Sequence, residues 1–373
     1  MLTARRVAPT PWLYAGAAAV VLFLFTLRAG WSGQLTDAGL APFSRMIDGT
    51  AARPFVHRML LPSIARGLHA LVPGPLRDAI ERSVRARPVL AGRLHWTTAH
   101  ASEVVIALLL AFGCFLAFAF VLRRLVQALP DAPEGASRWA PVVALLALPA
   151  VFLPGSVHLY DPATLLFFSL GLLMLTERRR IGYYAVFVLA CVNRETAILL
   201  TGLFLLRERR HLMPSRLALH GLAQAVLWAG LQAGIHARHA GNPGHEAQLL
   251  FPRNLRLLIE PRSGIGFWVL LVLAATLVVP GWNRKPRFLR QALLVTLLPV
   301  GLATFLAGLP TEMRDYLEAY PAIVLLALPT AVAWLTSRGS PPGSSRSPRG
   351  ERPKPASAPQ VESPLRPAGN SAS

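Results

Sequence analysis

The sequence predicts an all-α protein, a polytopic bundle of transmembrane helices. Two features of its composition indicate this fold class. Of the 373 residues, 53% are apolar and only 15% are charged, whereas an ordinary globular domain carries roughly 25% charged residues. The apolar residues also fall in long runs separated by short, basic connections. The chain therefore resembles a multi-pass membrane protein more than any soluble class.

The charge balance has two possible meanings. A net charge of +20, from 38 Lys and Arg against 18 Asp and Glu, favours nucleic acid or an anionic surface as the partner. In this chain the basic residues lie in the short connections between apolar runs and do not form a single basic surface. We therefore expect membrane lipid and no nucleic acid as a partner. Cys114 and Cys191 both lie within apolar runs, so neither a disulfide framework nor a cysteine zinc site is predicted.

Nine apolar stretches are candidates for membrane-spanning elements, because a bilayer core about 30 Å thick requires about 20 mostly apolar residues. The first stretch follows Arg5 and Arg6, as the apolar part of a signal peptide does. It has no small-x-small cleavage site followed by a soluble domain, so we interpret it as a retained helix. The stretches are 11–28, 103–122, 139–154, 162–176, 181–206, 217–237, 265–282, 291–309 and 320–337.

The short basic loops predict the orientation, because such loops face the cytoplasm. The opposite connections, 155–161 and 310–319, hold four acids and a single arginine. Both termini are accordingly predicted to be cytoplasmic, in a plasma (inner) membrane. The basic loops contain Arg5/Arg6, Arg123/Arg124/Arg138, Arg178/Arg179/Arg180, Arg207/Arg209/Arg210 and Arg284/Lys285/Arg287/Arg290.

Residues 181–206 admit two interpretations, a single tilted helix or two short arms. Basic clusters flank this stretch on both sides, so a single crossing would invert every later loop. Two arms that turn at Asn193-Arg194-Glu195 keep the basic loops inside, giving ten apolar arms in total. Such short arms are tolerated where their turn lines a polar cavity within the protein.

Four regions follow from this topology. Residues 1–28 are the cytoplasmic N-terminus and first helix, 29–102 a long outer loop, 103–337 the remaining bundle, and 338–373 a basic Pro/Ser-rich cytoplasmic tail that we expect to be disordered. In the outer loop, apolar residues from Phe55 to Leu71 recur at helical spacing between arginines, as in an interfacial amphipathic helix. A second such helix is predicted from Leu76 to Val89.

Ionisable residues at membrane depth mark a cavity, a partner or a function. Arg194 and Glu195 lie at the predicted turn, and they either neutralise each other or reach other partners. The second alternative is suggested by helix geometry, because neighbouring residues on a helix point about 100° apart. An arginine at the mouth of a cavity suits a phosphate, which its planar fork binds bidentately.

Other polar residues converge on the same outer face. His158 and Asp161 join two helices, and Asp161 before Pro162 fits a helix N-cap. Glu312 and Arg314 either form a surface salt bridge or line the site. Asp37 in the first loop is either a solvated turn residue or a general base toward an acceptor hydroxyl.

No cofactor is predicted. His236 and His239 share a helical face that His245 can approach, and three histidines of this kind are able to bind a divalent cation. The sequence offers no carboxylate ligand to complete such a site. We therefore assign no metal ligand. P-loop, GxSxG, HExxH and Gly-rich dinucleotide motifs are absent from the sequence.

Two local motifs carry a resemblance to a known family. One is Asp37 followed by Asp48-Gly49 and Pro54-Phe55, and the other runs from Thr164 to Asn193-Arg194-Glu195-Thr196. Together with the long first outer loop, they resemble the C-type (GT-C) membrane glycosyltransferases over roughly residues 11–320. The chain also resembles uncharacterised bacterial multi-pass membrane proteins with Arg53-Pro54-Phe55-x-x-Arg58-x-Leu60-x-Pro62.

The resemblance implies a glycosyltransferase with a polyprenyl-phosphate sugar as its donor, acting on the outer side of the membrane. It implies that Asp37 is the catalytic base and that Arg194 holds the donor phosphate. Arg58 would assist there, and Glu312 or Arg314 would close the cavity. The first loop lacks an Asp-x-Asp or Glu-x-Asp motif, which disfavours the metal-binding form of the site. A lipid or small-solute transporter, or an inactive scaffold of the same architecture, remains the alternative.

Overall fold

The computed structural model describes residues 11–37, 41–96, 100–129, 135–245 and 249–337. Within these ranges the chain is helical and contains no β-strand, apart from an isolated bridge between Arg53 and Gly244. The predicted all-α class is confirmed. The predicted disordered tail, 338–373, and the arginines at positions 5 and 6 lie outside the described residues.

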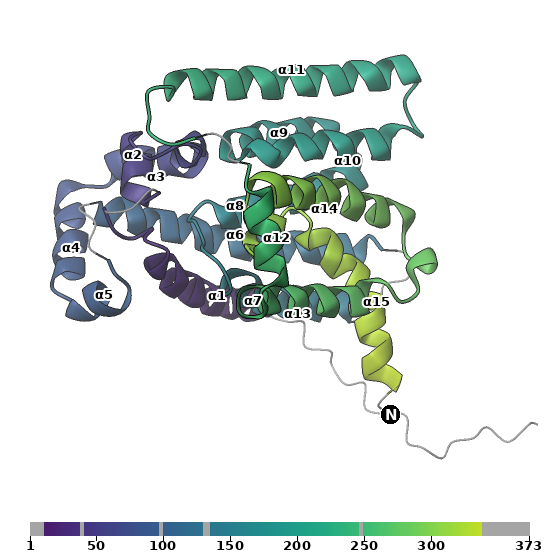
Figure 1. Cartoon of the computed structure of the whole chain (residues 1–373), viewed down its shortest axis with the longest axis horizontal. Helices are drawn as coiled ribbons and strands as arrows, with labels where there is room; N and C mark the ends of the chain where they lie inside the picture. Colours follow the sequence, from purple (N-terminus) through teal and green to yellow (C-terminus); the bar gives the residue numbers. More distant parts are fainter. Residues whose placement is uncertain (1–10, 38–40, 97–99, 130–134, 246–248, 338–373) are drawn as a thin grey trace, which may run out of the picture. The chain divides into compact units, whose positions relative to one another are not determined.

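Figure 1 shows the order of the helices along the chain. Among the described residues the α-helices are α1 (Pro11–Trp31), α2 (Phe43–Asp48), α3 (Leu60–Leu71), α4 (Gly74–Arg85), α5 (Pro88–Arg93), α6 (Ala101–Gln127), α7 (Ala136–Phe152), α8 (Asp161–Thr176), α9 (Arg180–Asn193), α10 (Ile198–Glu208), α11 (Pro214–Arg238), α12 (Phe251–Ile259), α13 (Pro261–Val278), α14 (Arg287–Ala307) and α15 (Tyr320–Ser337). Short 3-10 turns are η1 (Phe55–His57), η2 (Glu195–Ala197), η3 (Trp282–Arg284) and η4 (Met313–Tyr316).

Each predicted apolar stretch forms helix, and the stretch 181–206 forms two. Helix α9 ends at Asn193, Arg194 is extended (φ −159°, ψ 143°), and α10 begins at Ile198. The two-arm interpretation is thus confirmed, with the turn at the predicted residues. Helix α13 differs slightly from its predicted bounds, because it begins at Pro261, a residue favoured in the first helical turn.

The outer loop differs from its prediction in two places. The first amphipathic helix begins at Leu60 and not at Phe55, where the chain forms the short turn η1. Pro62 explains this start, because it has no N–H to donate to the carbonyl of Arg58 and is tolerated only in a first helical turn. The second helix ends at Arg85, since Pro88 favours the extended conformation of Arg87 (φ −109°, ψ 93°). Helices α2, α5 and α12 were not predicted.

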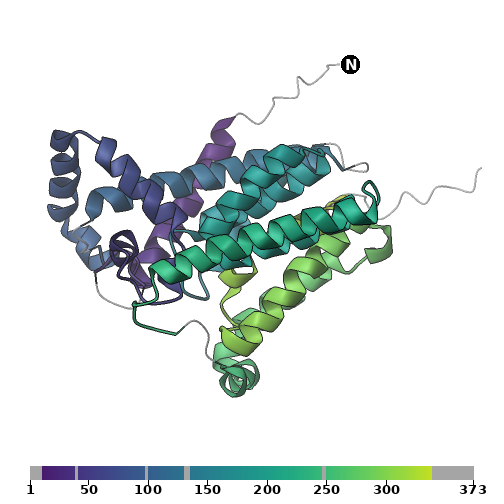
Figure 2. The same ribbon diagram turned by 90° about the horizontal axis from the view of Figure 1, so that it is seen from above.

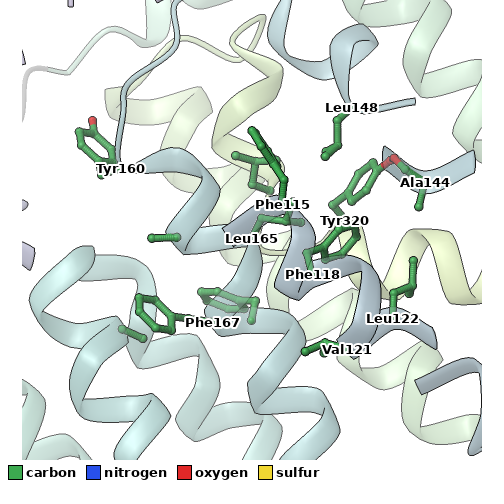
Figure 3. Packing of buried hydrophobic residues seen from close by; sticks show 14 of the residues in the cluster. Phe115, Phe118, Val121, Leu122, Ala144, Leu148, Tyr160, Leu165, Phe167 and Tyr320 are labelled. Atoms are coloured by element: carbon green, nitrogen blue, oxygen red, sulfur yellow. The ribbon is translucent and has the colours of Figure 1, made fainter. Parts of the chain in front are cut away.

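Helix α6 is the centre of the packing, and it contacts α1, α7, α8 and α3. Figure 3 shows Phe115 and Phe118 of α6 among buried side chains from α7 and α8, with Tyr320 of α15 reaching Ala144. The Tyr320 hydroxyl donates to the carbonyl of Ala144 at 2.5 Å. Helix α8 is apolar all round and largely buried, as expected for a helix surrounded by others.

A second group of helices lies beyond α8. Helix α9 packs on α8, and α11 contacts both α9 and α10; both views show α11 running beside them (Figures 1 and 2). Helix α14 packs on α10, and α12 joins α14 to α13.

Three helices in the described part of the chain are long and apolar enough to cross a membrane: α1, α6 and α14. Shorter apolar helices of 10–17 residues occur within α7, α8, α9, α13 and α15. These features indicate a membrane protein.

Candidate functional site

Charged side chains from four separate segments meet in one buried network, which we call the charge cluster. The segments are the residue after η1, the start of α8, the turn between α9 and α10, and η4 with the residues beside it. The cluster consists of Arg58, Asp161, Arg194, Glu195, Glu312, Arg314, Asp315 and Glu318. We interpret seven polar residues of the outer face as candidates for substrate binding: Arg58, His158, Asp161, Arg194, Glu195, Glu312 and Arg314. The cluster includes six of them, and His158 packs beside it.

Arg58 joins the outer loop to the cluster. Its Nη2 donates to Glu195 Oε1 at 2.9 Å, and its Nη1 donates to the hydroxyl of Tyr160. The guanidinium carbon lies 4.8 Å from the centre of the Tyr160 ring, in cation–π range. Burial alone would lower the pKa of Arg58, but the charge of Glu195 and the contact with Tyr160 outweigh it and raise that pKa.

Arg194 occupies the turn between α9 and α10. Its Nη2 donates to Asp315 Oδ1 at 2.6 Å, and its Nη1 lies 3.4 Å from Glu318 Oε1. The hydroxyl of Thr196 donates to the same Glu318 oxygen at 2.6 Å. Arg194 and Glu195 therefore form no ion pair with each other, because each pairs with a residue from another part of the chain. The extended backbone at Arg194, and not the step of a helix, directs the two side chains apart.

The turn itself is held from two neighbouring helices. Asn193 Nδ2 donates to Thr164 Oγ1 of α8 at 2.9 Å, and the indole N–H of Trp228 in α11 donates to the carbonyl of Glu195 at 2.9 Å. The bond from Trp228 satisfies a backbone carbonyl at the interruption of the helix, and the bond from Asn193 ties the turn to α8. The turn is thus a supported part of the fold.

Arg314 links the loops before α8 and α15. Its Nη2 donates to Glu312 Oε2 at 2.7 Å, and its Nη1 lies 3.7 Å from Asp161 Oδ1. The hydroxyl of Ser156 donates to Glu312 Oε1 at 2.9 Å. Because Arg314 is only 6% exposed, the pair with Glu312 is not the surface salt bridge that was one of the alternatives.

The expected N-cap role of Asp161 is wrong. Tyr160 occupies the N-cap position of α8, and Asp161 Oδ2 accepts a hydrogen bond from the backbone N–H of His158 at 2.8 Å. The carboxylate thus turns back toward His158, and its other oxygen lies 3.7 Å from Nη1 of Arg314.

His158 lies beside the cluster between two aromatic rings. It stacks on Tyr160 with ring centres 5.1 Å apart, and Phe55 lies at the same separation. Burial and the nearby charge of Arg314 lower the pKa of His158 well below its usual value. The imidazole is therefore neutral at pH 7.

The cluster combines excess negative charge with unused hydrogen-bond donors. Its three arginines face five carboxylates, a formal charge of −2 for these eight residues. Yet the buried Nε atoms of Arg58, Arg194 and Arg314 have no hydrogen-bond partner among the described residues. Buried guanidinium donors of this kind suit a hydroxylated ligand. An anion fits only where it displaces a carboxylate from its arginine, because the formal charge of −2 opposes added negative charge.

No family model, curated protein or solved structure matches this chain.

The structure does not bring Asp37 into the charge cluster. This residue is exposed, in the turn that follows α1. The same turn docks near the cluster, because the backbone N–H of Val157 donates to Ser32 Oγ at 3.0 Å. The role of Asp37 as a base stays a prediction.

Three cluster partners were missed as site residues: Tyr160, Asp315 and Glu318. All are buried, and Glu318 is only 1% exposed. The sequence held a signal for Glu318, since it immediately precedes the apolar stretch 320–337. An acid at the edge of a membrane-length helix is costly unless it is paired.

The described residues contain no group of three or more His, Cys, Asp and Glu side chains able to hold a metal ion. His236 stacks on His57 with ring centres 4.0 Å apart. His239 instead lines a cavity of about 440 Å³ between α2, α3 and the end of α11.

Proposed function

We propose that the chain is a multi-pass membrane glycosyltransferase that moves a sugar from a polyprenyl-phosphate donor to an acceptor on the outer side of the membrane. The observation that carries the proposal is the convergence of Arg58, Arg194 and Arg314 from three distant segments, each with a buried, unused N–H. A buried charge network is costly to assemble, so its convergence favours a ligand-binding role.

Apolar exposure supports the multi-pass arrangement, whereas the proposed ten arms and cytoplasmic termini rest on the short basic loops. Along α13, Ile265, Val269 and Val272 are each more than half exposed. A continuous apolar surface of this kind is unfavourable in water and suits hydrocarbon. A plasma-membrane location is part of the same proposal.

In the proposed reaction, the bond between the anomeric carbon and the phosphate oxygen breaks while the acceptor oxygen attacks that carbon. The acceptor proton passes to the carboxylate of Asp37, and the lipid phosphate leaves with the bonding electrons. Arginine N–H groups stabilise the charge that develops on the leaving phosphate. The side chain of Glu195 is 42% exposed. It can therefore move into solvent and leave Arg58 free to bind that phosphate.

The test is release of polyprenyl phosphate from a radiolabelled polyprenyl-phosphate hexose by the full chain in proteoliposomes, supplied with a lipid extract of the producing cells as the acceptor source. We expect Arg194→Gln and Asp37→Asn to abolish the release. Arg85→Gln is the matched control, because Arg85 is exposed and pairs only with Glu81 at 3.4 Å. Intact donor with the wild-type chain would contradict the proposal.

A transporter gives a different result in the same assay. The interrupted pair α9 and α10 is the feature that favours this alternative, since discontinuous helices often form transport sites. Movement of uncleaved donor between the two leaflets would support it.

A further inference from the structure

A second polar site lies on the other side of the segment that carries Arg58. Val56 and Met59 line the 440 Å³ cavity, whereas Arg58 between them points to Glu195 and Tyr160 in the charge cluster. One short stretch of chain therefore separates the cavity from the cluster. The volume of the cavity lies in the range of small-molecule sites, about 300–1,000 Å³.

The cavity has an apolar floor and a charged rim. Met46, Ile47 and Pro62 are buried and form part of the floor. The rim includes exposed Arg66, Arg238 and Asp48, and the carboxylate of Asp48 lies 3.2 Å from Nε2 of His100, so the two arginines outnumber the single acid. Arg66 is held in place, because its Nη1 donates to the carbonyl of Ile47 at 3.1 Å. Two guanidiniums at one rim favour a phosphate.

His239 supplies the decisive polar atom. This side chain is only 6% exposed, and its Nε2 has no hydrogen-bond partner among the described residues. The ring lies against Gly49, where the backbone has a φ of +72° and an added Cβ would come within 3.4 Å of Cε1. Glycine thus lets the backbone approach the imidazole closely.

His239 is a neutral imidazole at pH 7. Burial, together with the charge of Arg238, lowers the pKa of His239 below its usual value. A neutral imidazole has one N–H donor and one acceptor nitrogen. A ligand hydroxyl both donates and accepts, so it can form the hydrogen bond that Nε2 lacks among the described residues.

The neighbouring Asn242 supports this geometry. Its Nδ2 donates to the carbonyls of Gly49 and Ala51, both at 2.8 Å. The end of α11 is thereby tied to the loop after α2, which holds His239 against the cavity.

We infer that this cavity binds a polyol phosphate, with the phosphate on Arg66 and Arg238 and a hydroxyl hydrogen-bonded to Nε2 of His239. The inference does not depend on the proposed function, because the backbone from Val56 to Met59 separates this cavity from the charge cluster. The polyol phosphate is either a free sugar phosphate or the headgroup of a glycerol-based lipid.

Binding is measured on the full chain in nanodiscs, without any sugar donor. One arm titrates glucose 6-phosphate into discs of neutral lipid by isothermal calorimetry, with glucose and inorganic phosphate as separate controls. The other arm measures retention of fluorescent phosphatidylglycerol in discs of phosphatidylcholine. Saturable binding in either arm supports the inference and identifies the source of the ligand.

The variants separate binding from folding. His239→Asn keeps an amide near the Nδ1 position and removes Nε2, and should weaken binding about tenfold or more, as expected for a lost hydrogen bond in a buried site. Arg238→Gln should weaken it similarly. Arg216→Gln, at the exposed opposite end of the same helix, should leave it unchanged.

The outcomes also separate this inference from the proposed glycosyl transfer. Binding that is lost in His239→Asn, without any transfer by the wild-type chain, would support the site and remove the transferase. Equal affinity in His239→Asn and wild type, or no saturable binding in either arm, would overturn the inference even if transfer occurs.

Discussion

Arg58 and Glu195 form an ion pair at 2.9 Å across 137 positions of sequence. The pair connects the outer loop to the turn between α9 and α10, two segments with no local reason to meet. Arg58 is nearly buried, whereas the side chain of Glu195 is 42% exposed. This asymmetry predicts different energies for the individual pairs of the charge cluster.

A pair of double-mutant cycles tests that difference. We expect a coupling of about 0.5–1 kcal/mol between Arg58→Gln and Glu195→Gln, because solvent weakens an ion pair with one exposed partner. For Arg194→Gln with Asp315→Asn, whose side chains are 6% and 12% exposed, we expect about 2–3 kcal/mol. Free energies of unfolding from chemical denaturation in micelles give both values. Equal couplings would contradict this ranking.

Loss of the Arg194 side chain should be among the most damaging changes in the chain. Arg194→Met leaves Asp315 and Glu318 buried without their guanidinium, and removal of one partner from a buried pair costs about 3–5 kcal/mol. The melting temperature in detergent should fall accordingly. Arg85→Met, at an exposed pair, should change it little. A drop of similar size in both variants would refute the burial argument.

Sequence patterns predicted the helices well because apolar runs and basic loops are local signals. The split at Asn193 followed from charge alone. The start of α3 was missed because the backbone effect of Pro62 outweighs the apolar spacing from Phe55. The pairing of Arg58 with Glu195, and of Arg194 with Asp315, could not be predicted, since tertiary packing selects each partner.

Helix α1 offers a matched pair of glycines. A Cβ at Gly30 would overlap the backbone carbonyl of Leu94 and lie 2.8 Å from its carbonyl carbon, whereas nothing lies within 4 Å at Gly16. Gly30→Ala should therefore cost about 1–3 kcal/mol by overpacking. Gly16→Ala should be neutral or stabilise the helix by up to about 1 kcal/mol. Unfolding free energies of both variants check this; a tolerated Gly30→Ala would show that α1 does not pack on Leu94.

Asp315 and Glu318 should give opposite pH dependences. Burial raises the pKa of Asp315, but the charges of Arg314 and Arg194 outweigh it, so that its pKa is lowered from 3.8 in the folded state. The stabilisation by Asp315 is therefore present above pH 3.8 and is lost as the pH falls through the lower folded pKa.

For Glu318, burial outweighs the charge of Arg194 and raises the pKa above 4.5. The folded state then binds more protons than the unfolded state between pH 4.5 and that raised pKa, so stability falls as the pH rises through this window. Unfolding free energies at a series of pH values test both residues. Asp315→Asn should flatten the loss of stability below pH 3.8, and Glu318→Gln should remove the decline above pH 4.5. If both variants change the profile in the same direction, the assignment of opposite shifts is wrong.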